Sequence, residues 1–185
     1  MDYLIEEVLA EITSCLHLVS GDSLAQAGTM IEDAPKIFIS GAGRSGLMMR
    51  ALGTRLMHLG KTVYVVGEST TPSIQAGELL ILGSGSGQTT TLLAIAQKAQ
   101  SHGARILLFT TNPNSPLTKW ADQTVALPAP SLGDVADGRD LKSMQPMGSL
   151  FEQSLLILCD TIILGLMSRT GVSAAQMRER HANLE

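Results

Sequence analysis

Hydrophobic positions follow two patterns along this chain. Short continuous apolar runs predict buried strands at 36–40, 61–67, 78–83, 104–110 and 123–128. Between them, apolar residues recur at helical spacing, which predicts helices at 2–33 with a break or bend at Gly21, and at 45–60, 89–103, 115–121, 149–168 and 173–180. Helices that alternate with buried strands are typical of parallel sheets. The pattern therefore predicts an α/β fold: one three-layer α/β/α domain over residues 1–185, with a five-stranded, parallel, doubly wound sheet.

Composition narrows the class of protein. The 185 residues are 44% hydrophobic and 16% charged, which is enough to fill one compact core. The net charge is -4 and the 13 Lys and Arg residues are scattered, so nucleic acid is not an expected partner. The N-terminal residues are acidic where a secretory signal would be basic, so we expect a cytoplasmic protein.

The most apolar segment, 149–168, is interrupted by Glu152 and Asp160. It predicts a buried helix rather than a membrane span, and we expect it to be covered on all sides by packing against another subunit. Cys15 and Cys159 lie in helical stretches without a CxxC pattern. We interpret them as thiols that fill the core, and we expect no metal site.

Two glycine-rich loops join a strand to a helix. The first, SGAGRSG (40–46), contains G-x-G-x-x-G, a pattern that dinucleotide-binding folds use. The acidic partner that such a site needs would be Glu68, which lies farther along the chain than usual. Gly43, Arg44 and Ser45 of this loop are candidates for binding a substrate, and the alternative for Arg44 is a solvated residue at a helix start.

The second loop, SGSGQT (84–89), combines glycines and hydroxyl side chains, namely Gly85, Gly87, Ser84, Ser86 and Thr89. Glycines let backbone amides approach an anion, and a helix that begins near Gln88 would direct its positive end at it. The Walker pattern and its lysine are absent from the sequence, so a small sugar phosphate suits the loop better than a nucleotide. The alternative is an ordinary strand-to-helix turn with Ser and Thr caps.

Several motifs resemble the sugar isomerase (SIS) domain family over nearly the whole chain. They are GAGRSG, RLMHLG, VYVVGESTTP, SGSGQT, QPMGSLFEQ and RHANLE. The last two resemble the 6-phospho-3-hexuloisomerases of the ribulose monophosphate pathway in particular. The family's loop usually reads SGSGET, so Gln88 removes a negative charge near the expected phosphate.

The resemblance implies isomerisation of D-arabino-3-hexulose 6-phosphate to fructose 6-phosphate, a step of formaldehyde assimilation. It implies no metal or organic cofactor. It also implies a homo-oligomer, commonly a tetramer, with functional coupling to the hexulose phosphate synthase.

That reaction needs a base that removes a proton from C2 and returns one to C3. Glu152, at the start of the apolar helix, is the candidate. Ser149 and Glu152 also form a capping-box pattern, so a purely structural role is the alternative. The family resemblance favours catalysis.

A second group must move protons between the substrate oxygens, and histidine suits this near neutral pH. His17 and His102 lie on amphipathic helices and are expected to be surface or packing residues. His58 and His181 remain. For His181 a frayed terminus is the alternative, whereas the resemblance implies a tail that reaches a neighbouring subunit's site.

Other interpretations stay open. The chain could be another SIS isomerase, acting on arabinose 5-phosphate or sedoheptulose 7-phosphate, or a non-catalytic sugar phosphate sensor. A dinucleotide-binding oxidoreductase is a further alternative, suggested by the first loop. We expect 111–116 to be a structural turn, and 129–147 to be either a lid or disordered.

Overall fold

The computed structural model describes residues 1–130 and 142–184. Over these residues the chain forms a five-stranded sheet with the strand order β2-β1-β3-β4-β5 and parallel pairing throughout. The strands are β1 (Ile37–Gly41), β2 (Val63–Val65), β3 (Leu79–Gly83), β4 (Arg105–Thr110) and β5 (Gln123–Ala126). In the centre, Ile39 lies beside Val65 of β2 and Ile81 of β3. The predicted fold class is confirmed.

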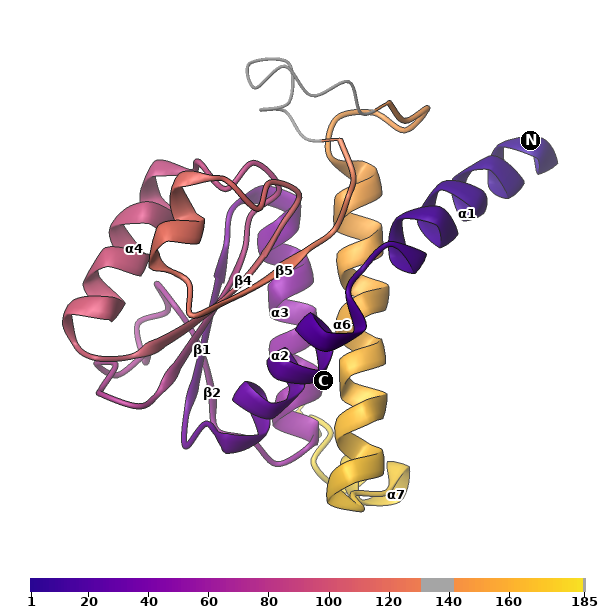
Figure 1. Ribbon diagram of the computed structural model, residues 1–185. Helices are drawn as coiled ribbons and strands as arrows, with labels where there is room; N and C mark the ends of the chain where they lie inside the picture. Colours follow the sequence, from indigo (N-terminus) through magenta and orange to yellow (C-terminus); the bar gives the residue numbers. More distant parts are fainter. Residues whose placement is uncertain (131–141, 185) are drawn as a thin grey trace.

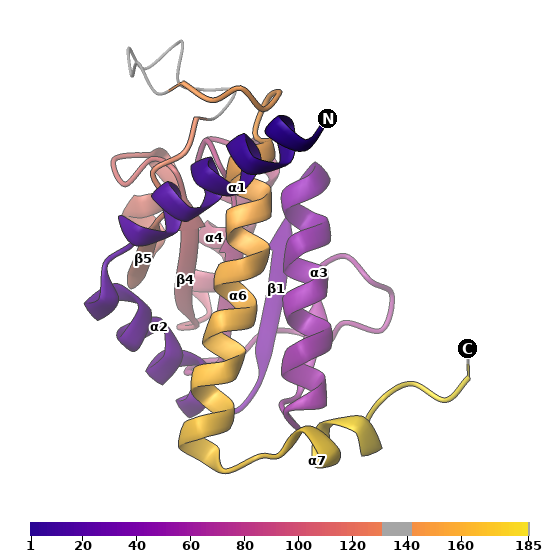
Figure 2. The ribbon, with the colours of Figure 1, turned by 90° about the vertical axis from the view of Figure 1, so that its right-hand side faces the viewer.

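Helices cover both faces of this sheet (Figures 1 and 2). One face carries α1 (Asp2–His17), α2 (Gly21–Asp33), α3 (Gly43–His58) and α6 (Ser149–Thr170), with α7 (Ala174–Glu179) near the end of α3. The other face carries α4 (Thr90–Ser101) and the 3-10 helix η1 (Pro116–Trp120). Successive strand residues point to opposite faces, so Ile37 and Ile39 join one apolar cluster and Phe38 joins the other.

The first glycine-rich loop sets how closely α3 approaches the sheet. A Cβ atom on Gly46 would lie 2.5 Å from the carbonyl oxygen of Gly41, and one on Gly41 would lie 3.0 Å from that of Gly83. Glycine is therefore required at both positions. The result is that the N-terminus of α3 lies directly against the ends of β1 and β3.

The outer strands differ from the prediction, whereas the first helical segment does not. All five strands were expected to be buried, but the edge strand β2 is only partly buried, as is most of β5, because each has a neighbour on one side only. The strand predicted at 61–67 is confined to Val63–Val65. The break expected near Gly21 is confirmed, because residues 18–20 separate α1 from α2. The Ser20 hydroxyl caps α2 by accepting a hydrogen bond from the Ser23 amide at 3.3 Å.

The apolar helix α6 is a core helix. Its length and composition would suit a membrane span, but half of its most apolar stretch is buried inside this fold, where it packs against α1, α2 and α3. Cys159 of α6 and Cys15 of α1 are both buried in the same apolar cluster, as predicted. In the single chain Ile157 of α6 is 42% exposed and Leu164 is 65% exposed. The expectation that another subunit covers this helix therefore stays a prediction.

Candidate functional site

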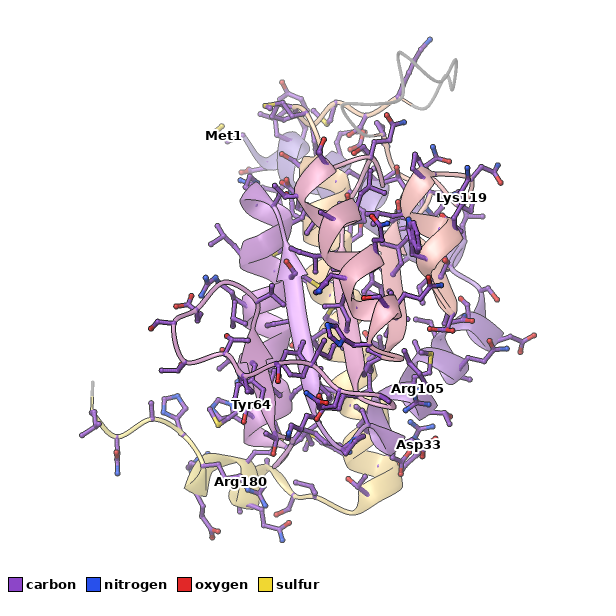
Figure 3. All side chains as sticks on the ribbon, turned by 90° about the vertical axis from the view of Figure 1, so that its left-hand side faces the viewer. Met1, Asp33, Tyr64, Arg105, Lys119 and Arg180 are labelled. Carbon is purple, nitrogen blue, oxygen red and sulfur yellow. The ribbon has the colours of Figure 1, made fainter. Side chains whose placement is uncertain are left out.

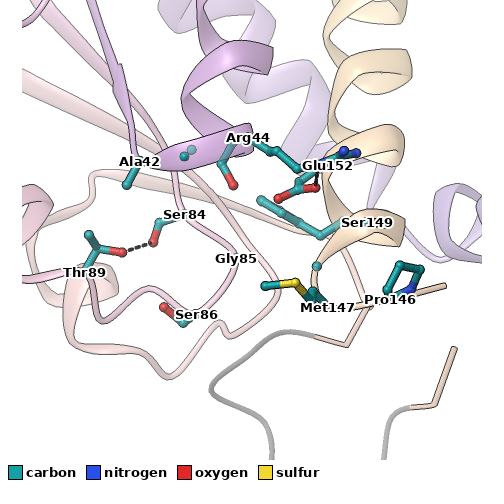
Figure 4. Close-up of a pocket in the computed structure, with 15 residues that line it drawn as sticks. Ala42, Arg44, Ser84, Gly85, Ser86, Thr89, Pro146, Met147, Ser149 and Glu152 are labelled. Atoms are coloured by element: carbon teal, nitrogen blue, oxygen red, sulfur yellow. Dashed lines mark hydrogen bonds and ion pairs between the residues drawn. The ribbon is translucent and has the colours of Figure 1, made fainter.

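A cavity of about 520 Å³ lies where the chain reverses its direction of winding through the sheet (Figure 4). After β1 the chain enters α3 on one face, and after β3 it enters α4 on the other, so the loops that follow these neighbouring strands diverge. Ligands of open α/β sheets bind at such points. The lining residues are 42–45, 83–86, 89, 146–149, 151 and 152.

Helix N-termini converge on this cavity. Among the described residues, α3 begins at Gly43, α4 at Thr90 and α6 at Ser149, each within or directly beside the lining segments. A helix N-terminus carries a partial positive charge and directs amide N–H groups outward. The cavity is therefore suited to an anionic ligand.

The SGSGQT loop is held from behind by the chain that follows β4. The carbonyl oxygen of Gly85 accepts hydrogen bonds from the Thr111 amide at 3.0 Å and the Thr110 hydroxyl at 3.0 Å. The backbone at Gly87 is left-handed (φ +64°), and a Cβ there would lie 2.0 Å from the Ser115 hydroxyl. The segment 111–116, predicted as a structural turn, is thus the support of the loop.

The hydroxyl groups of the loop lie on its cavity side. Ser84 Oγ accepts a hydrogen bond from the Gly87 amide at 3.2 Å and lies 3.3 Å from Thr89 Oγ1 (Figure 4). Ser84, Ser86 and Thr89 all line the cavity. The loop therefore presents several hydroxyl groups at the N-terminus of α4, whereas a simple helix cap needs one.

Glu152 and Arg44 form an ion pair across the cavity wall (Figure 4). Arg44 Nε donates to Glu152 Oε2, which joins the first turn of α3 to the first turn of α6. The Glu152 side chain is 14% exposed and that of Arg44 is 60% exposed. Arg44 is therefore solvated, as its alternative interpretation expected, and also paired.

The capping-box interpretation of Glu152 is wrong. The residue that precedes α6 is Gly148, which has no side chain that could cap the helix. The Glu152 amide donates to the Gly148 carbonyl at 3.0 Å, an ordinary helical bond, while its carboxylate turns to Arg44. The carboxylate is thus positioned at the cavity rather than used to close the helix end.

Sequence reasoning missed the segment that enters α6. Pro146, Met147 and Gly148 line the cavity, and Met147 has a left-handed backbone (φ 58°), which is rare for a residue with a side chain. Strained backbone of this kind is concentrated at functional sites. The available signal was the motif QPMGSLFEQ, of which only Ser149 and Glu152 were interpreted.

The structure brings most of the predicted residues to one place. Gly43, Arg44, Ser45, Ser84, Gly85, Ser86, Thr89 and Glu152 all line the cavity. Gly87 is buried and Gln88 is exposed, and neither of these two loop residues lines the cavity. Of the loop 129–147, for which a lid was one expectation, residues 131–141 lie outside the described residues.

His58 and His181 lie together but far from the cavity. Their rings stack with centroids 5.2 Å apart, and Arg180 donates to the His58 carbonyl at 2.9 Å. His58 ends α3, the helix whose other end carries Arg44, so about 20 Å of helix separates the two. Figure 3 shows Arg180 at the opposite end of the molecule from Met1. Within one chain, then, neither histidine reaches Glu152.

The environment of His58 is apolar and positively charged. His58 is only 4% exposed. Burial lowers the pKa of His58 below its ordinary value, and the neighbouring His181 and Arg55 lower it further. The other two histidines, His17 and His102, are exposed as expected.

The cavity belongs to a fold with known relatives. The SIS domain family matches residues 30–160. This chain belongs to the SIS domain family. The predicted resemblance is confirmed.

Relatives of this SIS-domain chain cover nearly all of it. It is 41% identical to the 3-hexulose-6-phosphate isomerase of Bacillus subtilis (strain 168), over 98% of this chain and 97% of the relative. It is 43% identical to the 3-hexulose-6-phosphate isomerase of Mycobacterium gastri, over 95% and 86%.

Solved structures show the same fold. One is the crystal structure of a hypothetical protein from Methanococcus jannaschii, for which the function of a 3-hexulose-6-phosphate isomerase was inferred. It has a TM-score of 0.85 and 34% identity over 99% of both chains. The structure of an Escherichia coli CFT073 protein in a ligand complex has a TM-score of 0.77 over 97% of this chain and 96% of its own. At 21% identity, this second structure is similar in fold alone.

Proposed function

We propose that this SIS-domain protein isomerises D-arabino-3-hexulose 6-phosphate to fructose 6-phosphate. One observation carries the proposal: a carboxylate, Glu152, faces the same cavity as the hydroxyl-rich loop at the N-terminus of α4. The names and coverage of the Bacillus and Mycobacterium relatives support the substrate. A cavity of about 520 Å³ has the size of a small-molecule site.

The phosphate group binds at the loop 84–89 in this proposal. Ser84, Ser86 and Thr89 donate hydroxyl hydrogen bonds, and the end of α4 contributes its partial positive charge. Gly85 lines the cavity without a side chain that would hold the anion away, and Gly87 lets the loop pack against Ser115. Gly43 and Ser45 lie at the facing N-terminus of α3 and bind the sugar hydroxyl groups.

Glu152 performs the proton transfers in the proposed reaction. Its carboxylate takes the proton from C2, and the C–H electron pair forms the C2=C3 double bond of an enediol as the C3 carbonyl oxygen takes a proton. The same group, now protonated, delivers its proton to C3 while the O2 hydroxyl loses its proton and C2 becomes the carbonyl. Arg44 orients the Glu152 carboxylate before it takes the proton, as the ion pair suggests.

The proton that moves from O2 to O3 needs a second group, and His181 and His58 stay the candidates. Because both lie about 20 Å from Arg44 in one chain, either one acts only if a neighbouring subunit supplies it. We therefore include a homo-oligomer, a tetramer, in the proposal. The exposed apolar side chains Ile157 and Leu164 of α6 support a subunit contact on that helix.

The remaining parts of the proposal concern cofactors, domain organisation, location and the supply of substrate. The proton transfers described above use side chains of the protein, so no cofactor enters the scheme. Residues 1–185 act as one SIS unit in the cytoplasm, and a hexulose phosphate synthase supplies the 3-ketose.

A coupled assay tests the activity. A purified synthase generates the 3-ketose from ribulose 5-phosphate and formaldehyde, and fructose 6-phosphate is measured through glucose-6-phosphate isomerase and dehydrogenase. The proposal expects fructose 6-phosphate to form only when this protein is present. If this protein converts arabinose 5-phosphate and leaves the 3-ketose unchanged, the proposed substrate is wrong, but the protein is still a sugar phosphate isomerase.

A further inference from the structure

Glu11 of α1 lies outside the cavity, yet its carboxylate contacts the segment that enters α6. Glu11 Oε1 accepts a hydrogen bond from the Met144 amide at 2.8 Å. Glu11 Oε2 accepts from the Ser143 hydroxyl at 2.6 Å and from the Gln145 side-chain amide at 3.0 Å. One carboxylate therefore fixes both backbone and side chains more than 130 positions away in the sequence.

The contacts continue from Glu11 toward the cavity. Gln145 is 8% exposed, and while its amide donates to Glu11, its side-chain oxygen accepts from Gln153 at 2.5 Å. Gln153 is the neighbour of Glu152 in the first turns of α6. The two glutamines of QPMGSLFEQ thus bond to each other across the start of α6, and Glu11 completes a partly buried polar network.

Only one residue separates Gln145 from the strained backbone of Met147. Pro146, Met147 and Gly148 form one wall of the cavity. A left-handed backbone at a methionine costs about 1 kcal/mol and persists only where its surroundings hold it. The network anchored by Glu11 lies directly before this residue and can hold it.

Helix α1 is a firm support for the carboxylate. Ile12 and Cys15 are 6% and 3% exposed, and they join the apolar cluster that includes α6. Figure 2 shows α1 crossing α6 near the end where α6 begins. Burial raises the pKa of Glu11, but the hydrogen bonds from Ser143, Met144 and Gln145 outweigh it and leave the pKa below its ordinary value of 4.5. The carboxylate is thus the form that these contacts stabilise.

We infer that Glu11 is a positioning residue for the isomerase site: it holds residues 143–148 and the start of α6, and thereby sets where Glu152 lies in the cavity. This inference deepens the proposed function and rests on it for its effect on turnover. It assigns no contact between Glu11 and substrate. The phosphate loop 84–89 follows β3 and is hydrogen-bonded to β4 and η1, not to the segment that Glu11 contacts. Loss of Glu11 should therefore affect proton transfer more than phosphate binding.

Kinetics of Glu11→Ala test the inference, with Glu7→Ala as the control, because Glu7 is an exposed acid on the same helix. We expect kcat of Glu11→Ala to fall by about 10- to 100-fold, since small displacements of a catalytic group have effects of that size. KM should stay within about threefold, because the loop 84–89 binds the phosphate. Glu11→Gln keeps one acceptor oxygen and should recover part of the lost kcat. Glu7→Ala should match the unchanged protein.

A second readout separates the inference from the proposed function. Amide hydrogen exchange at residues 144, 145 and 147–149 should speed up in Glu11→Ala and stay unchanged in Glu7→Ala, whatever the substrate is. If the unchanged protein fails to isomerise the 3-ketose, the proposed function is wrong, and the exchange result still decides whether Glu11 holds the segment. Unchanged exchange, or an unchanged kcat in an active enzyme, overturns the inference.

A double variant checks the route. Ser143→Ala removes a partner of Glu11 from the other side of the contact. If Glu11 acts through residues 143–145, the combined variant Glu11→Ala/Ser143→Ala has about the same kcat as Glu11→Ala alone, because both changes disrupt one network, in which Ser143 Oγ also accepts from the Gln145 amide at 3.0 Å. Multiplied effects would show that Glu11 acts by another route.

Discussion

Arg44 and Glu152 are 108 positions apart in the sequence, and their side chains form an ion pair at the wall of the cavity. The pair joins the N-terminal turns of α3 and α6. Both partners sit where helix ends direct positive charge inward, and Glu152 provides the negative charge among the described lining residues. The carboxylate is thus held at the cavity wall, with 14% of the side chain exposed.

Removing the arginine tests what the ion pair does. We predict that Arg44→Gln lowers kcat/KM by about 10- to 100-fold, since a hydrogen bond between charged groups contributes about 1.5–3 kcal/mol. Arg50→Gln is the control, because Arg50 lies on the same helix and pairs with Glu68 at 2.5 Å. Steady-state kinetics of both variants measure the difference. Equal activity of Arg44→Gln and the unchanged protein would show that the pair is incidental.

The glycine at position 87 is predicted to be irreplaceable for a steric reason. Gly87→Ala places a Cβ 2.0 Å from the Ser115 hydroxyl at a left-handed backbone position. We expect a loss of about 2–4 kcal/mol in unfolding free energy, from overpacking together with backbone strain. Urea unfolding measures it, and Gly21→Ala, where a Cβ meets nothing within 4 Å, is the control. A stable Gly87→Ala protein would contradict this packing of the loop.

The depressed pKa of His58 predicts a pH dependence of stability. The pKa of His58 lies below its ordinary 6.5 in the folded chain, so below pH 6.5 the unfolded chain takes up the proton first. The contribution of His58 to stability is therefore complete above about pH 6.5 and is lost as the pH falls toward the folded pKa, by at most about 1.4 kcal/mol per pH unit.

Urea unfolding at about pH 5.5 and 7.5 checks this contribution. His58→Gln should show a smaller difference between the two pH values than the unchanged protein. The exposed His102 supplies the control, His102→Gln, which should keep the full difference. The explanation fails if His58→Gln loses as much stability on acidification as the unchanged protein does.

The exposed apolar side chains Ile157 and Leu164 of α6 predict a subunit contact. Leu164→Glu puts a charge on a side chain that is 65% exposed in the single chain. If subunits pack there, burying that charge is unfavourable, and the variant should run as a smaller species in size-exclusion chromatography with light scattering. Gln100→Glu adds the same charge to an exposed position of α4 and should leave the mass unchanged. An unchanged mass for Leu164→Glu would remove α6 from the interface.

Much of the fold could be predicted because each buried strand carries its own apolar run. KIFIS, ELLILG and ARILLFT are buried from both sides, so their sequences alone indicate central strands. The edge strands could not be recognised as such, because KTVYVVG looks equally apolar although only Val63–Val65 pairs. For helix α6, composition predicts an apolar surface on nearly every side, but it cannot tell the face that the same chain covers from the face that carries Ile157 and Leu164, which are exposed in the single chain.

Some parts of the candidate site could likewise be predicted from the sequence and others could not. Its loops could be predicted from local chemistry, since glycines and hydroxyl groups after a strand indicate an anion site wherever the chain runs next. Glu11 could not be predicted, because its partners are more than 130 positions away and an acid on a surface helix is ordinary. The left-handed backbone of Met147 also leaves no signal in its residue type. His58 and His181 were selected by chemistry alone, which does not reveal that they lie at the other end of α3.

The role of Glu152 is the central claim, and one comparison tests it most directly. In the synthase-coupled assay, Glu152→Gln is measured beside the unchanged protein and beside Glu32→Gln, which removes a carboxylate paired with Arg169 at 3.1 Å. We predict that Glu152→Gln folds normally and loses at least about 100-fold in kcat, as expected for the loss of a general base, while Glu32→Gln stays fully active. A folded Glu152→Gln protein with the turnover of the unchanged enzyme would contradict the account.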